Sequence, residues 1–194
     1  MAATNVIKIF VDQGHNPENP NAGAEANGLR EQDINYQVGI YLAQFLEMDP
    51  RFAVMLSRPT PETSLGNSVA TSLAERVRMA NEWPADYFIS IHCNSNENPA
   101  INGTEVYVYQ LDSTAAKFGR SILDAIVARV GTKDNGLRVN STLYVLRKTT
   151  MPAVLVELAY LTNPQNAQLL ENNQWSFAYA IYEGILNYFG YRKL

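Results

Sequence analysis

Residues 6–15 read VIKIFVDQGH, a short apolar run that ends in polar residues and a histidine. Residues 6–11 are rich in β-branched side chains, and the Asp12-Gln13-Gly14 segment that follows is typical of a turn. The stretch therefore predicts a buried strand that ends just before His15.

Similar apolar runs recur along the chain and predict further strands at residues 52–57, 87–92, 104–109, 142–146 and 153–158. Between them, apolar residues at helical spacing predict helices at residues 31–48, 69–83, 114–130 and 174–189. This alternation indicates the α/β class, with a mostly parallel, twisted sheet of about six strands and helices on both faces. With 194 residues, the chain is expected to form a single domain over residues 1–194.

Composition excludes several classes of protein. The net charge of −4 gives no basic surface for nucleic acid or for an anionic membrane. We expect no membrane span, because no apolar run approaches the roughly 20 residues needed. The single cysteine excludes an internal disulfide framework. The N-terminal residues lead directly into the first strand, so no signal peptide is expected.

The chain holds only two histidines, His15 and His92, and each follows or ends an expected strand. Ligands of parallel sheets bind beyond the carboxyl ends of the strands. Two histidines and one carboxylate are a common ligand set for catalytic zinc, and Glu31 is the best-placed carboxylate because it opens the first long helix. Four other carboxylates remain possible: Asp12, Glu18, Glu25 and Asp33. The simpler alternative is that each histidine only forms hydrogen bonds to a loop.

Glu157 lies within MPAVLVELAYLTN (151–163), near the carboxyl end of a very apolar strand. An ionised carboxylate in such a setting is unfavourable unless it is paired or close to a metal ion. Beside a water molecule activated by a metal, this glutamate would be a natural general base. The alternative is a salt-bridged or solvent-facing residue at the end of a strand.

Other polar residues favour structural roles. Cys93 follows His92 directly, and neighbours in a strand point to opposite faces, so we expect Cys93 to be a packed residue and not the nucleophile of a cysteine hydrolase. Glu105 is expected to be structural or to support the site from outside its ligands. Three arginines could bind a substrate carboxylate, although structural ion pairs are the simpler interpretation: Arg58, Arg76 and Arg147.

Seven segments resemble, in order, the motifs of the zinc-dependent N-acetylmuramoyl-L-alanine amidases of the type-3 amidase fold, which are catalytic domains of bacterial autolysins and phage endolysins. The segments are VDQGH, NGLREQDIN, VMLSRPT, LAERVRMAN, ADYFISIHCNS, GTEVYVY and LYVLRKTTMPAVLVELAYLTNP. The chain departs from the family pattern at Gln13 (usually proline), Asn16 (usually glycine), Cys93 (typically alanine) and Ala159-Tyr160 (usually Gly-Phe). The changed first loop bears on substrate recognition but removes no ligand.

The resemblance implies that His15, Glu31 and His92 hold zinc (Zn2+) and that Glu157 is the catalytic glutamate. It implies hydrolysis of the amide between N-acetylmuramic acid and L-alanine in peptidoglycan, the polymer that is the expected partner. An extracellular or cell-wall location and a monomer are expected. No wall-binding domain is expected in this chain, so targeting would come from another domain or a partner. The rival functions are a zinc peptidase or deacetylase on a related fold, and an inactive wall-binding module.

Overall fold

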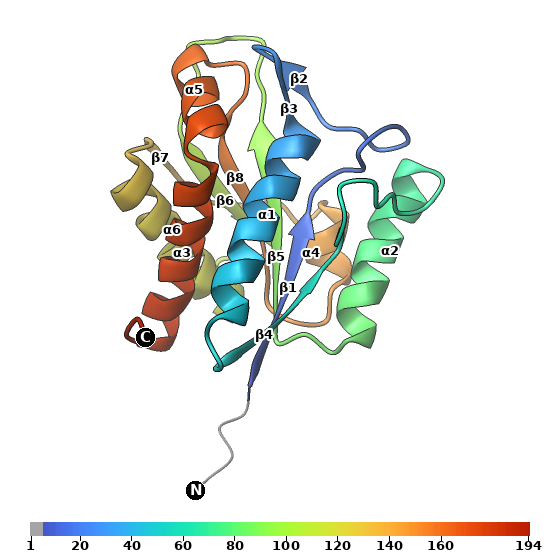
Figure 1. Cartoon of the computed structure of the whole chain (residues 1–194), viewed down its shortest axis with the longest axis vertical. Helices are drawn as coiled ribbons and strands as arrows, with labels where there is room; N and C mark the ends of the chain where they lie inside the picture. The colour runs from blue at the N-terminus through green and yellow to red at the C-terminus, as the bar shows by residue number, and fades with distance from the viewer. Residues whose placement is uncertain (1–5) are drawn as a thin grey trace, which may run out of the picture.

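A six-stranded sheet forms the middle layer of the computed structural model, which describes residues 6–194 (Figure 1). Its strand order is β4-β1-β5-β8-β6-β7. The strands are β1 (Ile7–Gln13), β4 (Phe52–Leu56), β5 (Tyr87–Asn94), β6 (Thr104–Val108), β7 (Asp134–Val139) and β8 (Ala153–Tyr160). Strands β4, β1, β5 and β8 are parallel, and the direction reverses between β8 and β6. The predicted mostly parallel sheet is therefore confirmed.

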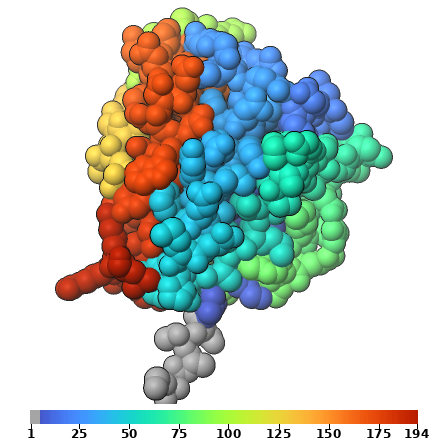
Figure 2. Space-filling model, viewed as in Figure 1, coloured from blue at the N-terminus to red at the C-terminus, as the bar shows by residue number. Residues whose placement is uncertain are grey.

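Two helical layers cover the sheet. Helices α1 (Glu31–Glu47), α3 (Thr114–Val130) and α6 (Gln174–Phe189) pack on one face, and α2 (Val69–Glu82) and the short α4 (Tyr144–Lys148) pack on the other. Helix α5 (Pro164–Asn172) links β8 to α6, and a small hairpin of β2 (Glu25–Ala26) and β3 (Leu29–Arg30) precedes α1. Figure 2 shows α1 and α6, in blue to cyan and orange to red, side by side on one face of the molecule.

Alternation along the strands decides which side chains can meet. In β5, Ile91 and Cys93 point into the large core under α1, α3 and α6, whereas Phe88 belongs to the smaller core under α2 and α4. His92 lies between Ile91 and Cys93 in the strand and so points to the α2–α4 side, and its register partner in β8 is Glu157. The fold thus brings a histidine and a glutamate together on the less covered face.

One predicted strand is wrong, and one strand of the sheet was not predicted. Residues 142–146 do not form a strand, because residues from Tyr144 onward form helix α4, which buries Val145 and Leu146 against α2 and the sheet. Their β-branched and aromatic composition favours a strand locally, but packing overrides this weak preference. The sixth strand is β7, in a region where the sequence predicted neither a strand nor a helix. It is a largely polar edge strand containing Gly136, so it carries no apolar pattern.

Helix α5 was also not predicted from the sequence. Within residues 6–194, no helix is long and apolar enough to cross a membrane. The expectation that the chain lacks a signal peptide concerns its first residues, and residues 1–5 lie outside the described part of the chain.

Candidate metal centre

The residues that follow β1 place His15 in close contact with His92. Gly14 makes this possible, since a Cβ there would lie 2.4 Å from both Cε1 and Nε2 of His92 and 2.7 Å from the carbonyl oxygen of Ile91. His15 follows with a φ of 70°, a conformation that side-chain-bearing residues adopt rarely. The two imidazole rings pack edge to face, with centroids 4.9 Å apart.

A buried arginine on α2 fixes the loop that carries His15. Arg76 donates hydrogen bonds to the Oδ1 of Asp12 (2.6 Å) and to the carbonyl oxygens of Gln13 (2.6 Å) and His15 (2.7 Å). Burial alone would raise the pKa of Asp12, but the charge of Arg76 and hydrogen bonds from Arg76 and Ser90 hold that pKa below its usual value. Arg76 is therefore one half of a buried ion pair, as the structural interpretation predicted.

Arg58 supports the same loop from the end of β4. It donates hydrogen bonds to the carbonyl oxygens of Gln32 (3.0 Å), Pro61 (3.0 Å) and His15 (3.4 Å). Burial and the neighbouring charge of Arg76 lower the pKa of Arg58 to about 10, so the side chain remains protonated at neutral pH. Arg147 lies elsewhere, on the exposed side of α4, where it lines a surface pocket with Tyr109.

Glu31, the first residue of α1, lies between the two histidines. Its Oε1 is 3.1 Å from Nε2 of His15 and 2.9 Å from Nδ1 of His92, and its side chain is almost fully buried. The backbone N–H groups of Cys93 (3.1 Å) and Ala24 (3.0 Å) donate to the same carboxylate. Burial raises the pKa of Glu31, but the hydrogen bonds from the two histidines outweigh it and keep the group ionised.

The other candidate carboxylates are engaged elsewhere. Asp12 pairs with Arg76 and accepts a hydrogen bond from Ser90. Three exposed acidic side chains surround Arg30 instead of the histidines: Glu18, Glu25 and Asp33. The structure therefore brings Glu31, and none of its four competitors, into contact with both imidazoles.

The geometry of this group fits a metal ion. One potential ligand atom from each of His15, Glu31 and His92 lies within 4.8 Å of the others. The Nδ1 of His15 lies 3.3 Å from the carbonyl oxygen of Asn21. An N–H on Nδ1 would leave Nε2 available as a metal ligand, in place of the hydrogen bond that it forms with Glu31 when no metal is bound. Two imidazoles and one carboxylate form a donor set suited to zinc with one open position.

Glu157 lies beside this group and has an unusual environment. Its Oε2 is buried and has no hydrogen-bond partner among the described residues. Burial, together with the nearby carboxylates of Glu31 and Glu105, raises the pKa of Glu157 well above its usual value. A carboxyl group that has one buried oxygen without a partner, next to a donor set for a metal, is typical of a functional site.

Glu105 lies directly opposite Glu157 in the β6–β8 pair and is fully buried. It accepts hydrogen bonds from Asn94 (2.6 Å) and Tyr160 (2.5 Å) and pairs with Arg138. This position agrees with the expectation that Glu105 is structural or supports the site from outside its ligands. The sequence could not show that it faces Glu157, because that depends on the register of two strands that are about 50 residues apart.

Cys93 takes no part in the centre through its thiol. Its Sγ lies on the α1 side of β5, 3.5 Å from the Oδ1 of Asn35. Burial, reinforced by the charges of Glu31 and Glu157, raises the pKa of the thiol well above its usual value, so it stays protonated. This agrees with the expectation of a packed residue and argues against a cysteine nucleophile.

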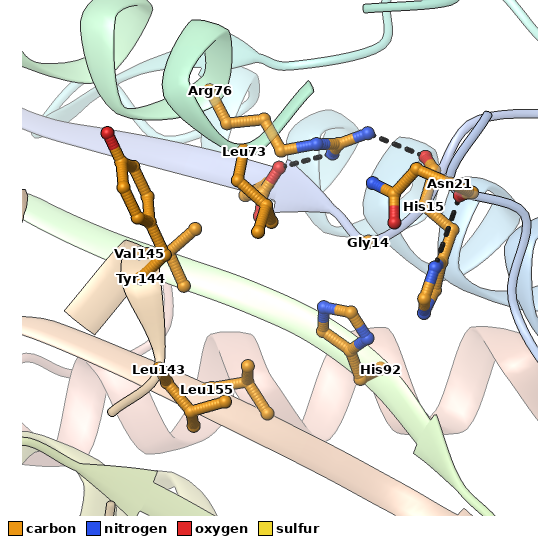
Figure 3. Close-up of a pocket in the computed structure, with 11 residues that line it drawn as sticks. Gly14, His15, Asn21, Leu73, Arg76, His92, Leu143, Tyr144, Val145 and Leu155 are labelled. Carbon is orange, nitrogen blue, oxygen red and sulfur yellow. Dashed lines mark hydrogen bonds and ion pairs between the residues drawn. The ribbon is translucent and has the colours of Figure 1, made fainter. Parts of the chain in front are cut away.

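A cavity of about 110 Å³ opens next to the histidines (Figure 3). Its walls come from the exit of β1, helix α2, the start of α4 and strands β5 and β8. Figure 3 shows His92 on one side of this space and Leu73, Val145 and Leu155 on the other.

Comparisons with known proteins support one family. Residues 9–187 match the family described as N-acetylmuramoyl-L-alanine amidase. The N-acetylmuramoyl-L-alanine amidase LytC of Bacillus subtilis is 33% identical over 186 residues, which cover 93% of this chain and 35% of LytC. The N-acetylmuramoyl-L-alanine amidase CwlM of Bacillus licheniformis is 33% identical over 184 residues, which cover 94% of this chain and 67% of CwlM. The chain thus spans about a third of the length of LytC.

A solved structure agrees with the sequence relatives. The catalytic domain of CwlV, an N-acetylmuramoyl-L-alanine amidase from Bacillus (Paenibacillus) polymyxa, superposes with a TM-score of 0.84 at 30% identity. The match covers 96% of this chain and 100% of that domain. The sheet and helices described above therefore correspond to a complete catalytic domain in that protein.

Proposed function

We propose, because this chain belongs to the N-acetylmuramoyl-L-alanine amidase family, that it hydrolyses the amide bond between N-acetylmuramic acid and L-alanine in bacterial peptidoglycan. The observation that carries the proposal is the convergence of His15, Glu31 and His92 beside Glu157, whose Oε2 is buried and has no hydrogen-bond partner among the described residues. A hydrolase of this kind needs both the ligands that hold the metal ion and a group that transfers protons.

His15, Glu31 and His92 would hold one zinc ion. When bound by such ligands, zinc acts as a Lewis acid that lowers the pKa of a water molecule toward about 7 and polarises a carbonyl group. Hydrogen bonds keep the ligands in place: Asn21 orients the ring of His15, and the backbone N–H of Cys93 orients the carboxylate of Glu31. Such support fixes the tautomer and direction of each donor.

Glu157 would move the proton. Its carboxylate accepts a proton from the attacking water and then donates it to the nitrogen of the departing L-alanine. The environment that raises its pKa favours the protonated form between these two steps, because the group is buried and faces other carboxylates. Glu105 lies opposite Glu157 on the neighbouring strand β6 and forms an ion pair with Arg138.

The site of action and the partners follow from the same proposal. We expect the protein to act on peptidoglycan outside the cell or at the cell wall, as a monomer. We expect wall targeting to come from another domain or from a separate partner protein. Residues 1–194 would then serve as the catalytic domain.

Digestion of purified peptidoglycan tests the function. The zinc-loaded protein should release stem peptides with a new amine on L-alanine and leave the N-acetyl groups of the saccharides intact. New amines within the stem peptide would indicate a peptidase, and free amines on the sugars would indicate a deacetylase. Binding to peptidoglycan without release of peptides would identify an inactive wall-binding module and contradict the proposal.

A further inference from the structure

Four aliphatic side chains line the cavity beside the histidines, and we refer to them as the aliphatic slot: Leu73, Leu143, Val145 and Leu155. Val145 and Leu155 are buried, whereas Leu73 and Leu143 are half-buried. Asp12 and Arg76 also line the cavity, but they form an ion pair with each other. A ligand group in the slot therefore meets mainly hydrocarbon.

The slot lies next to the atoms that would react. Gly14, His15 and His92 form its opposite wall, so its contents contact two of the expected zinc ligands. Leu155 precedes Glu157 by two residues on the same face of β8, a separation of about 7 Å along a strand. A group bound in the slot would thus be attached very close to the scissile amide.

The size and polarity of the slot restrict what it can take. Its volume of about 110 Å³ is smaller than the ~150 Å³ apolar cavity that admits a benzene ring. A sugar ring is too large, and its hydroxyl groups would find few hydrogen-bond partners among aliphatic side chains. A short aliphatic branch fits both limits.

We infer that the aliphatic slot binds a methyl branch that flanks the scissile amide, and that Leu73, Val145 and Leu155 determine specificity there. This inference rests on the proposed amidase reaction. The substrate of that reaction carries one methyl branch on each side of the amide, on the lactyl carbon of muramic acid and on the α-carbon of L-alanine. Either methyl group has the required chemistry, and substrate analogues distinguish them.

Three analogues of an N-acetylmuramoyl-L-alanyl peptide test the inference on the zinc-loaded protein. The first replaces alanine by glycine, the second replaces the lactyl group by a glycolyl group, and the third replaces alanine by valine. Removal of the methyl group that occupies the slot should lower kcat/KM about 10-fold, the usual effect of one missing carbon in an apolar pocket. Removal of the other methyl group should change kcat/KM less than about 3-fold.

Two variants change the slot itself. Leu73→Phe should fill it and lower kcat/KM for the parent substrate about 10-fold, with little change for the analogue that lacks the bound methyl group. Leu73→Ala should enlarge it and, if the alanine side is bound, raise the rate for the valine analogue relative to the parent. Met79→Ala is the matched control, because Met79 is half-buried on the same helix and packs in the same core but does not line the cavity.

The possible results distinguish a failure of the slot inference from a failure of the proposed amidase function. A response to the glycine analogue places the alanine methyl group in the slot, and a response to the glycolyl analogue places the lactyl methyl group there; either result supports the inference. Equal kcat/KM values for all substrates, in the wild-type protein and in both Leu73 variants, would overturn it while the amidase function stands. No cleavage of any substrate by the wild-type protein would overturn the function and the slot together. If a Leu73 variant fails to fold, the wild-type analogue series alone decides.

Discussion

Glu157 has an environment that folding alone does not explain. Its Oε2 is buried without a hydrogen-bond partner among the described residues, and its neighbours Glu31 and Glu105 repel a negative charge there. A leucine at this position would be more favourable for stability, because it would remove the buried polar group. Retention of a carboxyl group therefore indicates a chemical role.

Glu157→Gln should preserve the shape of the site but remove the proton carrier. We expect kcat to fall by about 10²–10⁴, the usual contribution of a general acid–base group, while the protein still binds one zinc ion per chain. Peptide release measured beside metal analysis checks both values. Near-normal turnover in the Glu157→Gln protein would exclude Glu157 as the acid–base residue.

Arg76→Met tests how the loop of His15 is held. The substitution leaves the Asp12 carboxylate buried without its partner and removes the donors to the carbonyl oxygens of Gln13 and His15. Unpairing a buried ion costs about 3–5 kcal/mol, and we expect weaker zinc binding because His15 is no longer fixed. Urea denaturation and competition with a chelator measure the two effects.

Arg78→Met is the matched control for this experiment. Arg78 is on the same helix, but its side chain is about half exposed and pairs only with Glu75 and Glu82 at the surface. Its loss should change stability by less than about 1 kcal/mol. An Arg76→Met protein that folds and binds zinc as tightly as this control would show that Arg76 does not position the ligand.

At the scale of elements, the sequence predicted the strands and helices that carry the site. The ends of β1 and β5 and the start of α1 follow from apolar runs bounded by polar residues, so all three ligand segments could be found without a structure. Helix α4 and strand β7 could not be predicted from the sequence. Val145 and Leu146 have the composition of a strand but are buried as a helical turn, and β7 is too polar to give a pattern. The slot depends on α4 and was therefore missed.

The turn between α1 and β4 is joined to helix α6 by a hydrogen bond whose contribution to stability depends on pH. Asp49 accepts hydrogen bonds from Arg51 (2.8 Å) and from the Tyr182 hydroxyl of α6 (2.8 Å). Burial raises the pKa of Asp49, but the bonds from Arg51 and Tyr182 outweigh it, so the pKa in the folded state lies below the usual value. These bonds should stabilise the fold above the unfolded pKa of about 3.9, and their contribution should be lost as the pH falls through the folded pKa.

Asp49→Asn should therefore lower the free energy of unfolding at pH 7 by about 1–3 kcal/mol. It should also reduce the loss of stability between about pH 5 and pH 2, because the titrating group is gone. Urea midpoints across this range measure both effects. Asp124→Asn, at an exposed position on α3, is the control. Parallel stability–pH curves for the wild-type and Asp49→Asn proteins would contradict the assignment.

At the scale of the whole molecule, the sheet order brings together segments that are far apart in the sequence. Strands β1 and β5 are neighbours, so His15 and His92 meet although 77 positions separate them. The alternation of strands and helices predicts the α/β class. The histidines at the carboxyl ends of the predicted strands indicate that the site lies at that end of the sheet. The selection of Glu31 among five carboxylates could not be derived from spacing, because it depends on how the loop before α1 folds back. The resemblance implied it, and the contacts with both histidines support it.

A metal ion bound at this point would join three segments and stabilise the whole fold. We expect zinc at 1,000 times its dissociation constant to raise the free energy of unfolding by about 4 kcal/mol, since the unfolded chain does not hold the site together. Removal of zinc with a chelator should lower Tm and abolish peptide release, and added zinc should restore both. An identical Tm with and without zinc would contradict binding at this site.

Zinc K-edge X-ray absorption of the protein loaded with one equivalent of zinc tests the ligand set most directly. We expect two imidazole nitrogens at about 2.0–2.1 Å from zinc and a carboxylate oxygen at about 2.0–2.2 Å, with the two-imidazole signal lost in His92→Ala. A sulfur ligand at about 2.3 Å, or a spectrum unchanged by His92→Ala, would contradict the centre formed by His15, Glu31 and His92.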